Sequence, residues 1–88
     1  MTAKQAVALK YQPETDTAPK VVAKGERKLA EQIVALGREH GVPVVEDELL
    51  ARLLFPLVPG QAIPEELYEP VAKILAYVAK FYYREGIG

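Results

Sequence analysis

Length, composition and charge limit the protein to a small single domain. The chain has 88 residues, of which 50% are apolar, and this composition is typical of a folded domain rather than a disordered chain. With 11 basic and 12 acidic side chains, the net charge of -1 gives no electrostatic reason to expect nucleic acid as a partner. No cysteine is present, which excludes disulfides and thiolate chemistry.

The sequence shows no targeting or membrane-spanning segment. The start of the chain, Met-Thr-Ala-Lys-Gln, lacks the apolar core of a signal peptide. No apolar run approaches the ~20 residues that a helix needs to span a bilayer. We therefore expect a cytoplasmic protein.

The first quarter of the chain predicts two strands. Residues 6–11 alternate apolar side chains with smaller or polar ones, as a strand with one buried face requires. Residues 12–20 contain two prolines and predict a loop. The short apolar run 21–24 then predicts a second strand, which Gly25 ends.

Residues 26–40 have the apolar period of a helix. Gly41 suits the left-handed residue that follows a helix, and Pro43 prevents the helix from continuing. Residues 42–45 then predict a third strand, with Pro43 at its start because proline cannot donate to a ladder. The side chains on the apolar face of the helix are Leu29, Ile33 and Leu36.

Two further helices are predicted in the second half of the chain. Asp47 is the expected N-cap of a helix over residues 48–55, which Pro56 ends. Pro64 suits the first position of the last helix. Pro70 lies too deep for that helix to be straight, so we expect a kink or a new helix start there.

The predicted order of elements is strand, strand, helix, strand, helix, helix. Because residues 21–45 have the length of a β-α-β unit, the second and third strands are expected to be parallel. This order predicts an α/β fold with a small mixed sheet of about three strands flanked by about three to four helices. We expect residues 6–85 to form the domain and residues 1–5 a flexible N-terminus.

The side chains offer little for catalysis or metal binding. His40 is the only histidine and, without cysteine, it cannot complete a zinc site of the usual kind. The chain has no serine, which excludes a Ser-His-Asp triad. The acidic run 46–48 could recruit a divalent cation, but its place before a predicted helix favours an N-cap with first-turn anions. We expect no enzyme activity, no cofactor and no metal.

An ordered set of segments resembles one known family. The segments are Ala-Val-Ala-Leu-Lys-Tyr at 6–11, Ala-Pro-Lys-Val-Val-Ala-Lys-Gly at 18–25, Gly-Val-Pro-Val-Val-Glu at 41–46, Leu-Ala-Arg at 50–52, Ile-Pro-Glu-Glu-Leu-Tyr at 63–68, Val-Ala at 71–72 and Leu-Ala-Tyr-Val at 75–78. Together they are similar to the FlhB/YscU family of type III secretion and flagellar export switch proteins, in the cytoplasmic domain just after the self-cleavage site. The resemblance covers residues 6–83, and it is the ordered set that makes it specific.

One departure from the family implies that this chain does not cleave itself. Family members carry Asn-Pro-Thr-His immediately before this region, and the chain is cut between Asn and Pro. Aligned from Ala6 without a gap, those places hold Met-Thr-Ala-Lys, and the chain contains no asparagine. We therefore expect no autocleavage, and a free-standing version of the post-cleavage fragment.

The resemblance also implies partners. In the family this domain sits under the export gate and takes part in switching from rod-and-hook substrates to filament substrates. The implied function is a non-catalytic binding module beside the membrane-bound apparatus, whose partners are export gate proteins, export substrates or a truncated FlhB. A patch that receives substrates would fall on Ala18, Pro19, Ala72 and Leu75. These four are also ordinary packing residues, and both interpretations stay open.

The alternative function is a self-associating structural or adaptor domain. In the family a strand before the cleavage site pairs within the same sheet, and nothing with strand character precedes Ala6 here. An open sheet edge would invite another strand, from a second copy or from a truncated FlhB. The other possibility is that residues 1–5 or 12–20 cover this edge.

Overall fold

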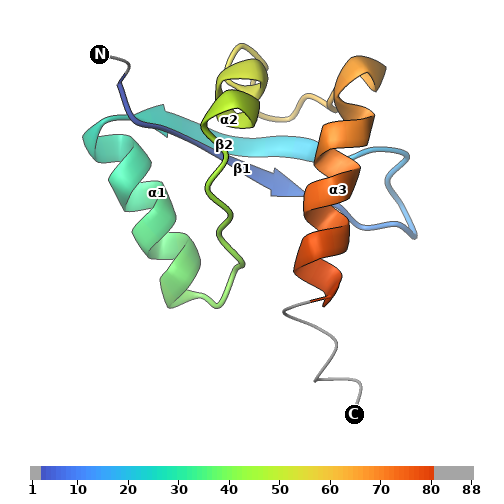
Figure 1. Ribbon diagram of the computed structural model, residues 1–88, viewed down its shortest axis with the longest axis horizontal. Coiled ribbons are helices and arrows are strands. Elements are labelled where there is room, and N and C mark those ends of the chain that lie inside the picture. Colours follow the sequence, from blue (N-terminus) through green and yellow to red (C-terminus); the bar gives the residue numbers. More distant parts are fainter. Residues whose placement is uncertain (1–2, 81–88) are drawn as a thin grey trace.

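A computed structural model describes residues 3–80 of the chain (Figure 1). In chain order its elements are β1 (Gln5–Lys10), β2 (Lys20–Glu26), α1 (Lys28–Glu39), α2 (Glu48–Leu54), the short 3₁₀ helix η1 (Glu65–Leu67) and α3 (Tyr68–Val78). Helix α1 lies on one side of the two strands and α2 on the other (Figure 1). None of the described helices is long and apolar enough to cross a membrane.

The two strands form an antiparallel sheet. Gln5 pairs with Glu26 at one end of the ladder and Lys10 with Lys20 at the other. The register shifts after Ala8, which leaves Val22 without a partner and forms a β-bulge. A bulge of this kind bends the strand and increases its twist.

Small residues on one face of the sheet allow α1 to approach closely. Ala6 lies opposite Gly25 and Ala8 opposite Ala23, so alternation places all four on the same face. Ala30 of α1 is completely buried, with 0% of its surface exposed. The buried Ala30 therefore brings the helix close to the sheet, and Leu29 beside it packs over Gly25.

The apolar stripe of α1 is only partly buried, with Ile33 half-buried and both leucines exposed. Leu29 is 51% exposed and Leu36 58% exposed, whereas an amphipathic helix ordinarily buries such a stripe. The small residues of the sheet explain the difference, because Ala30 lies directly against them and Leu29 packs over Gly25, which leaves about half of the leucine exposed. The sequence period thus predicted the helix correctly, but it did not identify the side chain that meets the sheet.

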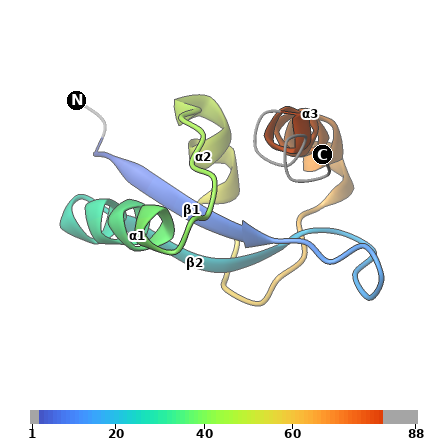
Figure 2. The ribbon, with the colours of Figure 1, turned by 90° about the horizontal axis from the view of Figure 1, so that it is seen from below.

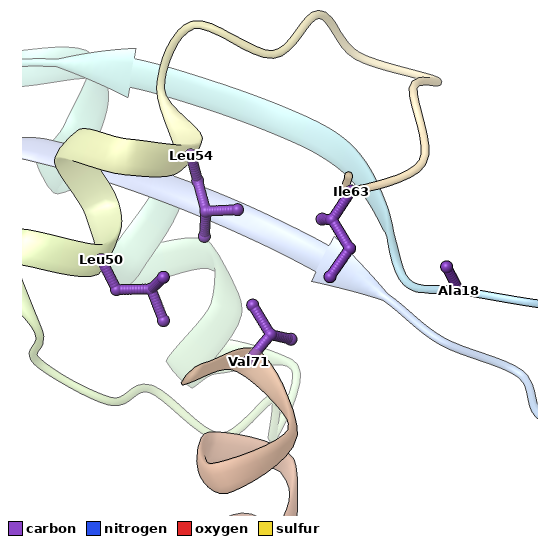
Figure 3. Packing of buried hydrophobic residues seen from close by; sticks show 5 residues of the cluster. All are labelled: Ala18, Leu50, Leu54, Ile63 and Val71. Atoms are coloured by element: carbon purple, nitrogen blue, oxygen red, sulfur yellow. The ribbon is translucent and has the colours of Figure 1, made fainter. Parts of the chain in front are cut away.

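The larger core lies on the opposite face of the sheet, between β1, α2, α3 and the loops beside them (Figure 3). Val7 and Leu9, which alternate with the alanines of β1, pack against it. Lys24 ties β2 to the end of α2, because its Nζ donates a 2.7 Å hydrogen bond to the Phe55 carbonyl and lies 4.9 Å from the centre of that ring. The buried members of the cluster are Ala18, Leu50, Leu54, Ile63 and Val71.

The predicted third strand is wrong. Within the described residues the sheet has two strands, and residues 42–45 belong to neither of them. After α1 the chain passes beside β1 and reaches α2 on the other face (Figures 1 and 2), so it crosses the sheet edge instead of following it. Pro43 also lacks the N–H that a ladder needs. The expected parallel pair and its crossover are therefore absent from the described fold.

The predicted helix boundaries on either side of this segment are confirmed. Gly41 has φ of 73°, and the N–H of Val42 donates to the Gly37 carbonyl over 2.8 Å, which closes α1 with a Schellman motif. Asp47 is the N-cap of α2, where its Oδ1 accepts a 3.0 Å hydrogen bond from the N–H of Leu50. Both signals are local, so the sequence carries them directly.

Pro70 is accommodated by a new helix start. The chain forms η1 after Pro64 and then changes to α-helix at Tyr68, which makes Pro70 the third residue of α3. The N–H groups of a first helical turn have no partner within the helix, so proline costs no hydrogen bond at this position. This outcome agrees with the expected interruption near Pro70.

Candidate partner-binding patch

Ala18 and Pro19 lie in the loop that leads into β2, and both are buried. The N–H of Ile63 donates a 2.9 Å hydrogen bond to the Pro19 carbonyl. Two residues further, Val21 exchanges hydrogen bonds with Gly60 and Gln61. Residues 60–63 therefore run along the outer edge of β2 and hold the predicted patch residues in place.

Ala72 and Leu75 lie one turn apart on α3, with different exposure. Ala72 is exposed, and Leu75 is half-buried against the cluster that contains Ala18. The structure thus brings Leu75 and Ala18 into one apolar assembly, with Pro19 beside it and Ala72 at its solvent side. Ala18 and Pro19, in the loop before β2, are therefore buried, and the accessible part of the predicted patch lies on α3.

Ile63 is a further member of this assembly that the sequence pattern does not indicate, although only 2% of its surface is exposed. It is an isolated apolar residue between Ala62 and Pro64, and neither a helical nor a strand period surrounds it. Its role depends on the hydrogen bond to Pro19, which brings together segments far apart in the sequence. No local pattern could have indicated this contact.

The polar candidates have structural roles. His40 Nδ1 lies 2.9 Å from the Leu36 carbonyl at the end of α1. In the acidic run, Asp47 caps α2 and Glu48 forms a 3.3 Å ion pair with Arg52. Residues 3–80 contain no group of three or more His, Cys, Asp or Glu side chains arranged to hold a metal ion. The fold is that of a small α/β domain in which Leu75 is half-buried against the core.

Comparison with known proteins identifies the family. Residues 3–78 match the family described as FlhB, HrpN, YscU and SpaS, and the chain belongs to that family. The flagellar biosynthetic protein FlhB of Aquifex aeolicus is 49% identical over 74 residues, which are 83% of this chain. The chain spans only 21% of the length of that relative.

Two other proteins are similar over most of their own length. The uncharacterized protein YlqH of Bacillus subtilis is 40% identical over 77 residues, covering 88% of this chain and 83% of YlqH. A crystal structure of a mutated EscU C-terminal domain is 34% identical, with a TM-score of 0.81 over 86% of this chain and 93% of that one. The family resemblance predicted from the sequence is confirmed, and the α/β fold is that of the EscU C-terminal domain.

Proposed function

We propose that this domain is a non-catalytic binding module of the flagellar or type III protein export apparatus, which acts in substrate recognition or export switching. Membership of the family and the names of the FlhB relatives support this function. Its partners are export gate proteins or export substrates. The chain corresponds to about a fifth of the length of FlhB. The proposed role is therefore that of this domain and not the whole activity of FlhB.

The partner surface in this proposal is the α3 side of the patch. The observation that carries it is the difference between Ala72 and Leu75. Half-buried Leu75 provides an apolar floor that is continuous with the core, and Ala72, one turn before it on α3, is exposed. An apolar side chain of a partner could cover this floor, because burying apolar surface stabilises a complex in proportion to the area removed from water.

Ala72→Asp tests this surface. It places a charge where the partner's apolar side chain would be desolvated, and we expect affinity for purified export gate domains or hook-class substrates to fall about tenfold or more. Circular dichroism should show an unchanged fold, because the position is exposed. The matched control is Ala35→Asp, at an exposed alanine of α1. A folded Ala72→Asp protein that binds like the parent would contradict the proposal.

Leu75→Asp separates packing from binding. A carboxylate against the apolar cluster has no partner, so we expect the free energy of unfolding to fall by roughly 2–4 kcal/mol. Ala72→Asp should lower it by less than about 1 kcal/mol, as at other surface positions. Thermal unfolding of the two variants gives this comparison, and equal stability would show that Leu75 does not support the core.

The second candidate function is pairing through a sheet edge. Among the described residues β1 is hydrogen-bonded to β2 alone, and the segment that crosses its other edge on the way to α2 makes no backbone hydrogen bond with it. The occupant would be a strand of a second copy or of a truncated FlhB. An elution volume that changes with protein concentration would favour self-association, and a constant volume favours the first proposal.

A further inference from the structure

A groove lies on the flank of α3 that faces away from Ala72 and Leu75. It is formed between residues 44–47 and the side chains of Lys73, Ile74 and Tyr77, and has a volume of about 390 Å³. At 3.6 residues per turn, Lys73 and Tyr77 project to the other side of the helix from the patch, and Ile74 lies between them and the core. The groove is therefore a separate surface, independent of the proposed patch.

The floor of the groove is apolar and open to solvent. Val44, Val45 and Ile74 are half-buried, and Tyr77 is 51% exposed. The segment that was expected to be a strand provides one wall of the groove because it crosses the sheet edge towards α2. Its two valines thus line the groove and do not belong to a ladder.

The charges on the two rims differ in sign. Glu46 and Asp47 lie on one rim and Lys73 on the other. Asp47 uses one oxygen to cap α2, whereas Glu46 and Lys73 form no hydrogen bond or ion pair with any described residue. The acidic rim thus has spare acceptors for a cation, and Lys73 has donors for a peptide carbonyl.

We propose that this groove binds a short protein segment that carries an apolar side chain next to a lysine or arginine. The apolar side chain covers Ile74 and the valines, and the basic group pairs with Glu46 at the acidic rim. Lys73 donates to a backbone carbonyl of the segment. A groove lined by so few side chains falls short of the roughly 800 Å² per partner of a stable interface, which favours a short segment over a second folded copy.

The test uses the full chain and the peptide acetyl-Gly-Lys-Leu-Lys-Gly-amide. We expect the amide signals of residues 44–47 and 73–77 to shift on titration in a nitrogen–proton NMR spectrum. A peptide with glutamate in place of both lysines should bind about tenfold more weakly, and so should one with serine in place of leucine. Equal affinity for the lysine and glutamate peptides, or shifts confined to other elements, would overturn the proposal.

Charge reversal of the rim gives the matched comparison. Glu46→Lys should weaken binding of the lysine peptide and improve binding of the glutamate peptide. Glu39→Lys makes the same change of net charge at an exposed position of α1 and should leave both affinities unchanged. If the two variants behave alike, the attraction is only that of net charge and the groove is not the site. Ala72→Asp should not alter this binding, so the failure of either surface is visible separately.

The same NMR spectra distinguish two other possible occupants of the groove. If the groove signals of the protein alone shift on dilution, the occupant is a second copy of the chain. If removal of residues 81–88 shifts these signals, and the peptide binds only after the removal, the occupant is the end of the chain itself. Either result overturns the proposal of a partner segment.

Discussion

Arg27 has a backbone conformation that usually requires glycine. Its φ is 56° and its ψ -121°, and it is the only non-glycine residue with positive φ in the described part of the chain. Its N–H donates to the Lys4 carbonyl over 2.8 Å, and its carbonyl accepts from the N–H of Glu31. These bonds hold the turn from β2 into α1, against a strain of about 1–3 kcal/mol.

Arg27→Gly should stabilise the protein. We expect the free energy of unfolding to rise by about 1 kcal/mol, since glycine removes the strain but gains entropy in the unfolded chain. Arg27→Ala is the control, because it removes the side chain and keeps the strained backbone. Urea unfolding of the parent and the two variants provides the measurement. A glycine variant that is no more stable than the alanine variant would contradict the proposal that the backbone of Arg27 is strained.

Helix α2 depends on its cap at the level of the element. Asp47 accepts the hydrogen bond from Leu50 at the start of a short helix that supplies two buried leucines to the core. Asp47→Ala should therefore lower the free energy of unfolding by about 1 kcal/mol, whereas Asp47→Asn keeps an acceptor and should cost much less. A chemical denaturation series decides this, and equal losses would show that charge matters rather than the cap.

The contact between β2 and α1 depends on Gly25. A Cβ there would lie 2.6 Å from Cδ2 and 2.9 Å from Cβ of Leu29, too close for either residue to remain in place. Gly25→Ala should cost roughly 1–3 kcal/mol as an overpacked contact. In a Leu29→Ala background most of this loss should disappear. A double-mutant cycle measures the coupling, and additive losses would mean that Leu29 is not the obstacle.

The sequence predicted correctly those helix boundaries that are determined by residues close to them in the chain. Asp47, Gly41 and the prolines act within a few residues of the helix ends that they define, and the structure confirms the boundaries. The third strand failed because strand pairing depends on where the chain must go next, and here it must reach α2 on the other face of the sheet.

The arrangement of the predicted patch and of the helix faces depends on contacts that no local sequence pattern indicates. The buried face of α1 depends on alanines and a glycine of the two strands, which the helical period alone does not contain. The family resemblance indicated the four patch residues, but not that Ala18 lies in the core or that Ile63 holds Pro19. Their division into buried loop and accessible helix could be read only from the structure.

In the whole molecule, α3 is the helix that contributes to both proposed binding surfaces. Val71 fixes it to the core, with 1% of its surface exposed, and its two flanks carry the proposed patch and the proposed binding groove. A helix held in this way can present two surfaces in a fixed relation. In a domain of this size a small core leaves little stability to spare, so changes at the exposed flanks are better probes of function than changes in the core.

The most direct test of the central claim is amide-shift mapping with a partner. The isotope-labelled protein would be titrated with a purified hook-class export substrate from the same organism. A binding module predicts saturable shifts centred on Ala72 and Leu75, which are lost in Ala72→Asp and kept in Ala35→Asp. Saturable binding that leaves α3 unshifted, or that persists unchanged in Ala72→Asp, would contradict the account.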